Sequence, residues 1–153
     1  MNKYEKDEYY MSLAISLAKE ALEQGEIPVG AVIVFNDEII ATGKNTKETN
    51  FDPSGHAEIN AIKEASKKLK NWRLSDCTLY VTLEPCPMCS SLIAEARISR
   101  ICFGAYDIGK GGISRPYNIF NEFYKNTNIQ IKGGILEKEC KELLDQFFKN
   151  KRQ

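Results

Sequence analysis

A histidine and two cysteines in this chain have the residue types and the spacing of a metal site. His56 is followed thirty positions later by Cys86, and Cys89 comes three positions after that. One imidazole and two thiolates supply three ligands to a tetrahedral zinc ion and leave its fourth position for water. This open arrangement is typical of catalytic zinc, because structural sites usually fill all four positions with protein ligands. We therefore expect one zinc ion per subunit, bound by these three side chains.

A carboxylate stands beside the expected site. Glu58 lies two positions after His56 and is not needed as a ligand. Zinc lowers the pKa of a bound water from about 15.7 to roughly 7, which makes a hydroxide nucleophile available, and Glu58 can accept the released proton. The alternative is a structural zinc clasp whose fourth ligand is Glu58 or another cysteine. It is disfavoured because only one pair of ligands with a short spacing is present.

The pattern His56-Ala57-Glu58 followed by Pro85-Cys86-Pro87-Met88-Cys89 resembles the signature of zinc-dependent nucleobase deaminases. The resemblance implies hydrolytic deamination with Glu58 as the catalytic residue. The glutamate would pass a proton to the ring nitrogen next to the carbon under attack and then assist the departure of ammonia. Such a reaction needs no organic cofactor.

Hydrophobic periodicity predicts the elements that carry these motifs. In the first half we expect a helix ending near Gly25, strands Val29 to Phe35 and Ile39 to Thr42 joined by an Asn36-Asp37 turn, a loop from Asn50 to Gly55 and a helix from about Ala57 to Lys68. A strand Thr78 to Leu83, a helix Pro87 to Ala96 and a strand Ile98 to Ala105 are expected next. The last part is expected to contain a short apolar segment Ile119 to Tyr124, a weak strand near Ile129 to Ile131 and a final helix from Lys138. The histidine and the cysteine pair thus fall at two helix starts.

The order of these elements predicts the fold class. A strand, a helix and a strand in so short a segment imply parallel pairing through a right-handed crossover. We predict one α/β domain over residues 1–153, with a central mixed sheet and helices on both faces. The resemblance to the deaminases implies the three-layer cytidine deaminase-like fold, whose sheet has five strands.

Composition excludes several classes of protein. No apolar run approaches the roughly 20 residues of a membrane span, and the first residues are too charged for a signal peptide, so we expect a cytoplasmic protein without membrane contact. Five cysteines are then thiols and metal ligands rather than disulfides. Cys77, Cys102 and Cys140, which lie among apolar neighbours, are predicted to be small buried side chains.

The 21 basic and 21 acidic residues leave no net charge, so any contact with nucleic acid has to be local. Two basic clusters are candidates: Lys63, Lys67, Lys68, Lys70 and Arg73 in one, and Lys149, Lys151 and Arg152 in the other. A solvated helix face explains either cluster equally well. Trp72, beside the first cluster, could stack on a base, but we expect a core anchor because a tryptophan between a helix and a strand is usually buried.

Further segments resemble one family more closely. They are Glu26-Ile27-Pro28-Val29-Gly30-Ala31-Val32, His56-Ala57-Glu58-Ile59, the run from Leu79 to Cys89, Phe103-Gly104-Ala105-Tyr106-Asp107, and the tail from Gly133-Gly134-Ile135-Leu136 to Arg152. Together these segments resemble the bacterial tRNA-specific adenosine deaminases over nearly the whole chain. The resemblance implies a homodimer that converts the wobble adenosine of a tRNA anticodon stem-loop to inosine, with the base extruded into the zinc pocket.

The same resemblance implies substrate-binding residues. Asn45 is expected to hydrogen-bond the adenine ring, although a turn residue after the second strand is an equally good interpretation. Val29 and Pro28 are expected to wall the pocket, and Asp107 to lie near the neighbouring sugar. A terminal helix is expected to grip the stem-loop through Phe147, Phe148, Lys149 and Arg152. The family commonly has a lysine two residues after the aspartate, whereas here Lys110 follows at three and Arg115-Pro116-Tyr117 makes the next loop bulky. Lys110 is expected to reach a phosphate of the substrate, with a lysine that only solvates a turn as the alternative.

Two other functions fit parts of the sequence. A guanine or cytosine deaminase of the same fold, acting on a free base or nucleotide, is favoured by the neutral net charge. A tRNA-binding scaffold subunit without activity is a third hypothesis, and it ranks last because Glu58 is present.

Overall fold

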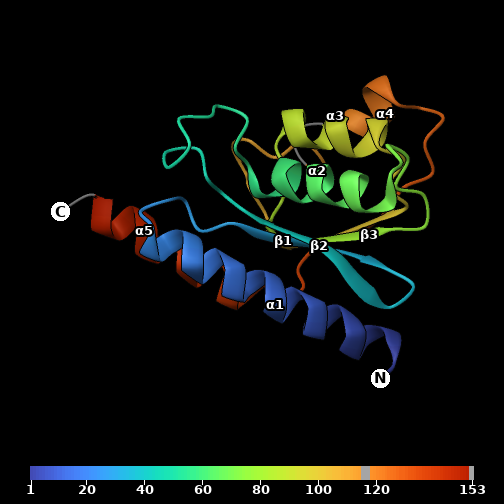
Figure 1. Cartoon of the computed structure of the whole chain (residues 1–153). Coiled ribbons are helices and arrows are strands. Elements are labelled where there is room, and N and C mark those ends of the chain that lie inside the picture. The colour runs from blue at the N-terminus through green and yellow to red at the C-terminus, as the bar shows by residue number, and fades with distance from the viewer. Residues whose placement is uncertain (115–117, 152–153) are drawn as a thin grey trace.

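Five strands form one mixed sheet in the computed structural model, which describes residues 1–114 and 118–151 (Figure 1). The strands are β1 (Gly30–Phe35), β2 (Glu38–Lys44), β3 (Thr78–Leu83), β4 (Arg100–Ala105) and β5 (Gln130–Lys132). Their order is β2-β1-β3-β4-β5. β1 runs antiparallel to β2 and β3, whereas β3, β4 and β5 run parallel. The predicted mixed sheet and the parallel crossover from β3 to β4 are confirmed.

Helices cover both faces of the sheet. They are α1 (Lys3–Glu23), α2 (Ala57–Leu69), α3 (Pro87–Glu95), α4 (Ile119–Phe123) and α5 (Glu137–Lys151). Figure 1 shows α1 and α5 on one face and α2, α3 and α4 on the other, which confirms the three-layer arrangement. None of the helices in the described residues has the length and apolar content that crossing a membrane requires.

Alternating side chains along the strands divide the core in two. Ile33, Leu79 and Phe103 pack towards α2 and α3, while Val32 and Tyr80 pack towards α1 and α5. This alternation follows from the period of two in an extended strand. The three cysteines outside the metal motif are also buried, as predicted: Cys77 in the first cluster and Cys102 and Cys140 in the second.

Close contact between the hairpin and α2 sets the position of the metal motif. Asn36 and Asp37 both have positive φ angles, of 51° and 60°, as the predicted tight turn between β1 and β2 requires. At Gly43 of β2, an added Cβ would overlap the backbone of Ala57 and Ala61. The absence of a side chain at Gly43 therefore lets the first turns of α2 lie directly on the sheet.

Trp72 contradicts the sequence prediction. Its side chain is 55% exposed instead of forming a core anchor. Leu74 takes the buried position between α2 and β3, with no exposed surface and a backbone N–H that donates to Ala96 O at 2.7 Å. The tryptophan ring lies outside this contact, with the guanidinium carbon of Arg73 4.6 Å from its centroid.

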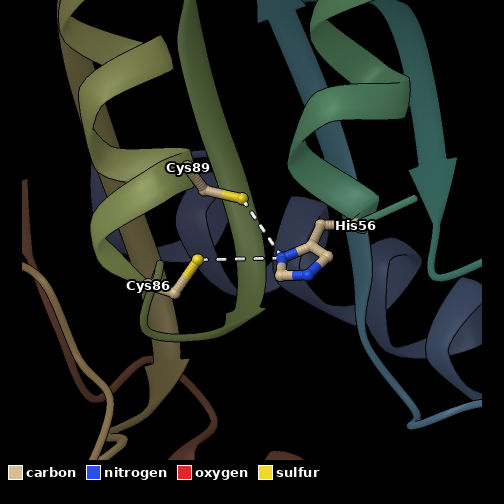
Figure 2. Close-up of side chains that lie close together, drawn as sticks. All are labelled: His56, Cys86 and Cys89. Atoms are coloured by element: carbon tan, nitrogen blue, oxygen red, sulfur yellow. Dashed lines mark hydrogen bonds between the residues drawn. The ribbon is translucent and has the colours of Figure 1, made fainter. Parts of the chain in front are cut away.

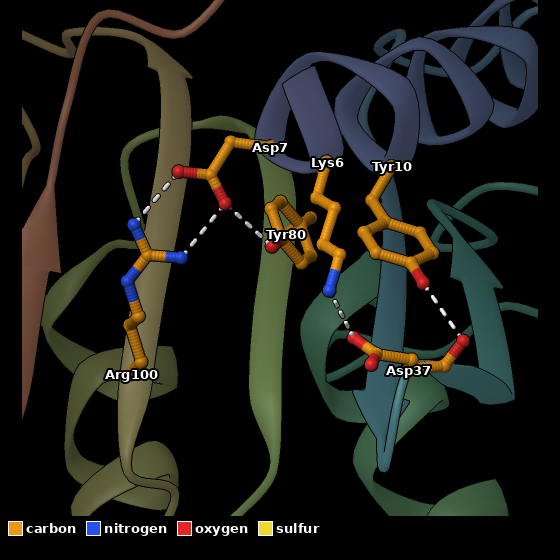
Figure 3. Close-up of polar contacts among 6 residues, drawn as sticks. All are labelled: Lys6, Asp7, Tyr10, Asp37, Tyr80 and Arg100. Carbon is orange, nitrogen blue, oxygen red and sulfur yellow. Dashed lines mark hydrogen bonds and ion pairs between the residues drawn. The ribbon is translucent and has the colours of Figure 1, made fainter. Parts of the chain in front are cut away.

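A buried ion pair joins α1 to the sheet at the end far from the metal motif. Asp7, 2% exposed, accepts two hydrogen bonds of 2.8 Å from the guanidinium of Arg100 and one of 2.7 Å from the hydroxyl of Tyr80 (Figure 3). Burial alone would raise the pKa of Asp7, but the hydrogen bonds from Arg100 and Tyr80 outweigh it and hold this pKa below its ordinary value. The ionised carboxylate is therefore part of the folded structure.

Asp7→Asn should lower the free energy of unfolding by about 3 kcal/mol, because Arg100 would keep a buried charge without its counterion. Asp37→Asn is the matched control, since the Lys6–Asp37 pair in Figure 3 is exposed, and it should cost less than about 1 kcal/mol. Urea unfolding measures both values. Equal losses in the two variants would contradict the role given to Asp7.

The Asp7–Arg100 ion pair should also make the stability of the fold depend on pH. The pKa of Asp7 is lower in the folded than in the unfolded protein. Its contribution to folding stability is therefore complete above the unfolded pKa of about 3.9 and is lost as the pH falls through the folded pKa. The stability difference between the wild type and Asp7→Asn should therefore shrink in acid.

Candidate metal centre and active site

Two helix starts converge on the candidate metal centre. His56 is the N-cap residue of α2, Cys86 is the N-cap residue of α3, and Cys89 lies in the first turn of α3. Pro87 occupies the start of α3, where a missing backbone N–H costs nothing. Neither the His56 nor the Cys86 side chain caps its own helix. Both point instead into the space between the helices, where Figure 2 shows the two sulfurs facing one ring nitrogen.

The distances fit a shared zinc ion. The sulfur atoms of Cys86 and Cys89 lie 3.7 and 3.4 Å from His56 Nδ1, and the three donor atoms are all within 4.8 Å of one another. Ligands of one tetrahedral zinc, bound at about 2.3 Å for sulfur and about 2.0 Å for nitrogen, would lie about 3.5 Å apart. The donor set and its spacing therefore suit zinc with one position left open.

The side chains around this point favour the thiolate form, which a zinc ligand must adopt, at Cys86 but not at Cys89. Hydrogen bonding from Cys89, together with the nearby imidazole, lowers the pKa of Cys86 to about 4. Hydrogen bonding to Cys86 raises the pKa of His56 in turn. The hydrogen bond to Cys86 and burial raise the pKa of Cys89. The positive ends of α2 and α3 add to the attraction for negative charge.

Glu58 lies beside the three ligands without joining them. It is 4% exposed and is not among the side chains whose donor atoms cluster, which within the described residues are only His56, Cys86 and Cys89. Burial raises the pKa of Glu58 to about 7, and a bound divalent cation would lower it again. A carboxylate placed beside a zinc-bound water can accept a proton from it and pass that proton on. The role of Glu58 as a proton carrier, and not as a fourth ligand, stays a prediction.

The predicted pocket residues of the first loop lie at the end of the sheet where β1 begins. Pro28 and Val29 are buried just before β1, and the backbone N–H of Asn45 donates to Val29 O at 3.1 Å. The Asn45 side-chain oxygen accepts the N–H of Lys47 at 3.0 Å. Asn45 is thus a turn residue in the protein alone. Its side-chain nitrogen makes no hydrogen bond within the described part of the chain, so a role in binding a base stays a prediction.

The other predicted contacts lie on separate segments. Asp107 is partly buried after β4, where its side chain accepts the N–H of the exposed Lys110 at 3.1 Å. Phe147, Phe148 and Lys149 belong to α5, which packs on α1 and the sheet and not on α2 or α3. Figure 1 places the last turns of α5 at the same end of the molecule as the start of α2. Arg152 and residues 115–117 lie outside the described residues.

Two buried glutamates near the site were not predicted. Glu26, 1% exposed, accepts hydrogen bonds from the backbone N–H groups of Glu48 and Thr49 at 3.0 and 2.6 Å. Glu84, 2% exposed, accepts N–H groups from the loop after β4. Each carboxylate holds a loop in place through hydrogen bonds from that loop's backbone N–H groups. Their positions directly before Ile27-Pro28 and Pro85-Cys86 were the only available signal, since the sequence does not reveal burial of an acidic residue.

Comparison with known proteins places these features in one family. Residues 4–105 match the family model described as the cytidine and deoxycytidylate deaminase zinc-binding region. The matched segment contains the histidine, the glutamate and both cysteines of the centre. The tRNA-specific adenosine deaminase of Bacillus subtilis is 47% identical over 148 residues, which cover 96% of this chain and 91% of the relative.

Solved structures agree with the fold. A structure from a study of A-to-I editing by tRNA:A34 deaminases at the wobble position superposes with a TM-score of 0.86 and 37% identity, over 89% of this chain and 99% of the other. A guanine deaminase from Bacillus subtilis is 42% identical but covers only 69% of this chain and 66% of its own, with a TM-score of 0.63. The similarity to the structure from the tRNA:A34 deaminase study therefore extends over more of this chain than the similarity to the guanine deaminase.

Replacing a ligand should release the metal. His56→Ala and Cys89→Ser are each expected to lower the bound zinc from one ion per chain to a small fraction of that, because two remaining ligands bind weakly. Cys77→Ala, which removes a buried thiol outside the centre, should retain the full amount. Elemental analysis of the purified variants measures this. Full zinc content in Cys89→Ser would contradict the assignment.

Proposed function

The chain belongs to the cytidine and deoxycytidylate deaminase zinc-binding family, and we propose that it converts adenosine to inosine at the wobble position of tRNA anticodons. The observation that carries this proposal is the cluster of His56, Cys86 and Cys89 with the buried Glu58 beside it. Relatives named tRNA-specific adenosine deaminase, which match nearly the whole chain, support the choice of substrate.

The residues of the site divide the reaction between them. Zinc held by His56, Cys86 and Cys89 would lower the pKa of water, so that hydroxide is available at neutral pH. Glu58 would take the proton from the water and donate it to the ring nitrogen beside the reacting carbon. It would then transfer the second proton of the water to the departing amino group. Water adds and ammonia leaves, so the exocyclic amine is replaced by oxygen.

Several segments around the centre support binding of an extruded base. The buried Pro28 and Val29 offer apolar surface, and the Asn45 amide group offers a donor for a ring nitrogen. Asp107 and the exposed Lys110 lie on the loop after β4. On α5, Lys149 and the 46% exposed ring of Phe148 offer charge and a stacking surface to the stem-loop. We assign these side chains to RNA binding, together with Phe147 and Arg152.

We also propose that the active form is a homodimer. The outer surface between α2 and α3 has a pocket of about 560 Å³ lined by Ile62, Trp72, Leu92 and Ala96 among others. Lys63 and Lys67 line it from α2, and Glu95 lines it from α3. In a twofold dimer the same patch meets itself, so the lysines of one copy can face the glutamate of the second. This self-complementary charge favours a second copy as the occupant.

Domain organisation and location follow from the same proposal. We propose that residues 1–153 act as one domain, since helices on both faces share one sheet and the relative from Bacillus subtilis matches 96% of the chain. We propose a cytoplasmic location, which a tRNA substrate supports. The five cysteines, none of them in a disulfide, suit that reducing compartment.

A guanine deaminase remains the second candidate because of its 42% identity to part of the chain. It is less well supported, since that similarity leaves out about a third of this chain. The hypothesis of a scaffold subunit is not favoured, because Glu58 lies buried at the centre where a proton carrier is needed.

The wild type should form inosine in an anticodon stem-loop transcript with adenosine at the wobble position, and Glu58→Ala should not. The variant should still contain one zinc ion per chain, because the three ligands are unchanged. Inosine sequencing and elemental analysis measure the two properties. Loss of zinc from Glu58→Ala would instead identify the glutamate as a ligand, and ammonia released from guanine but not from the RNA would support the second candidate.

Leu92→Glu should convert the dimer to a monomer, because it would place a charge inside the apolar pocket between α2 and α3. Tyr4→Glu, at a 62% exposed position on α1, is the control and should leave the dimer intact. Native mass spectrometry distinguishes the two forms. A monomeric wild type, or a Leu92→Glu protein that stays dimeric, would contradict the proposed interface.

A further inference from the structure

One buried side chain holds two separate points of the segment that follows β4. Oε1 of Glu84 accepts the N–H of Asp107 at 3.1 Å, and its Oε2 accepts the N–H groups of Ile113 and Ser114 at 3.1 and 2.8 Å. The Ser114 hydroxyl lies 2.9 Å from each oxygen. We name residues 107–114 the β4 loop. Its first and last backbone groups thus converge on one carboxylate.

The Glu84 side chain is buried and accepts hydrogen bonds from the β4 loop alone among the described residues. The side chain is 2% exposed, and among the ion pairs of the described residues none involves it. A buried carboxylate without a cationic partner needs several hydrogen-bond donors to offset its loss of hydration. Here every hydrogen-bond donor to the Glu84 side chain in the described chain comes from the β4 loop. If the loop moved away, the charge would be left without those donors.

The β4 loop also packs directly on the turn that carries the metal ligands. The N–H of Gly112 donates to Pro85 O at 2.8 Å, immediately before Cys86. At Gly111, an added Cβ would overlap the Glu84 carboxylate. The loop therefore contacts both the carboxylate and the backbone of the cysteine turn. Loop, carboxylate and cysteine turn form one packed unit.

We propose that Glu84 is a positioning residue, which fixes the β4 loop against the cysteine turn and so holds the loop's substrate-facing groups at a set place relative to the metal centre. The proposal rests on the proposed function, in which Asp107 and Lys110 of this loop meet the RNA. Glu84 itself touches neither the substrate nor the zinc ligands' donor atoms. Its effect on the reaction passes through the loop.

Two substitutions disturb the contact between the Glu84 carboxylate and the β4 loop, one by changing the carboxylate and the other by changing the loop. In Glu84→Gln, the amide has one acceptor oxygen, and its NH₂ group would face backbone N–H donors in either orientation. Gly111→Ala leaves the carboxylate unchanged but places a methyl group against it. Asp7→Asn is the matched control, since it also removes a buried carboxylate charge, 2% exposed, at the other end of the sheet.

The test measures amide hydrogen exchange, zinc content and kinetics on the anticodon stem-loop, at a temperature where circular dichroism shows every variant folded. Glu84→Gln and Gly111→Ala should each speed exchange in the β4 loop about tenfold. Each should keep one zinc ion and raise KM about tenfold, with kcat changed less than about threefold. Asp7→Asn should leave loop exchange and KM at wild-type values.

Unchanged loop exchange in both variants would overturn the proposal, as would zinc loss from Glu84→Gln or an equal rise of KM in Asp7→Asn. If Glu84→Gln does not fold, Gly111→Ala and the milder Ser114→Ala decide the question, with a smaller increase expected for the latter. The exchange measurement needs no substrate. A wild type that makes no inosine would therefore refute the proposed function, while the exchange result would still decide whether Glu84 holds the loop.

Discussion

The metal centre forms only because the first residues of two helices, α2 and α3, approach one point. A shared zinc ion requires the ring nitrogen of His56 and two cysteine sulfurs to lie within a few ångströms of one another. The sulfurs of Cys86 and Cys89 lie 3.7 and 3.4 Å from that nitrogen. The first residues of α2 are held by their close contact with β2 at Gly43, and α3 is fixed because it connects the adjacent strands β3 and β4. The sheet therefore determines the spacing of the donor atoms.

Buried charge is used differently at the two ends of the sheet. At the end far from the metal centre, Asp7 is paired with Arg100 and joins α1 to β4, which serves stability. Around the metal centre, the buried carboxylates of Glu26 and Glu84 are satisfied by backbone N–H groups of loops. A backbone donor fixes the path of a loop, whereas an ion pair joins two side chains. This difference suits loops that must present residues to a substrate.

Much of the fold and of the metal centre could be predicted from the sequence. Local patterns sufficed for the hairpin turn at Asn36-Asp37, for the strand of alternating residues from Thr78 to Leu83, and for the two helix starts that carry the metal ligands. Interactions between distant residues could not be read in this way. Asp7 and Arg100 are 93 positions apart, and their pairing depends on how α1 lies on the sheet.

The prediction for Trp72 failed for a related reason. Its residue type suggested a buried anchor, but Leu74, two positions further on, fills the available space, so the larger ring stays outside. Glu84 shows the opposite case, a charged residue type that is buried because a loop supplies its hydrogen-bond donors. The exposure of Trp72 is decided by a residue two positions away, and the burial of Glu84 by a loop that begins 23 positions away, and residue type alone identifies neither neighbour.

X-ray absorption at the zinc edge identifies the atoms bound to the metal. For the zinc-loaded wild type we expect two sulfur ligands at about 2.3 Å and two nitrogen or oxygen ligands at about 2.0 Å. The spectrum of Glu58→Ala should superpose on it, since that carboxylate is not a ligand. A third sulfur, or a changed first shell in Glu58→Ala, would contradict an open zinc site with a free glutamate beside it.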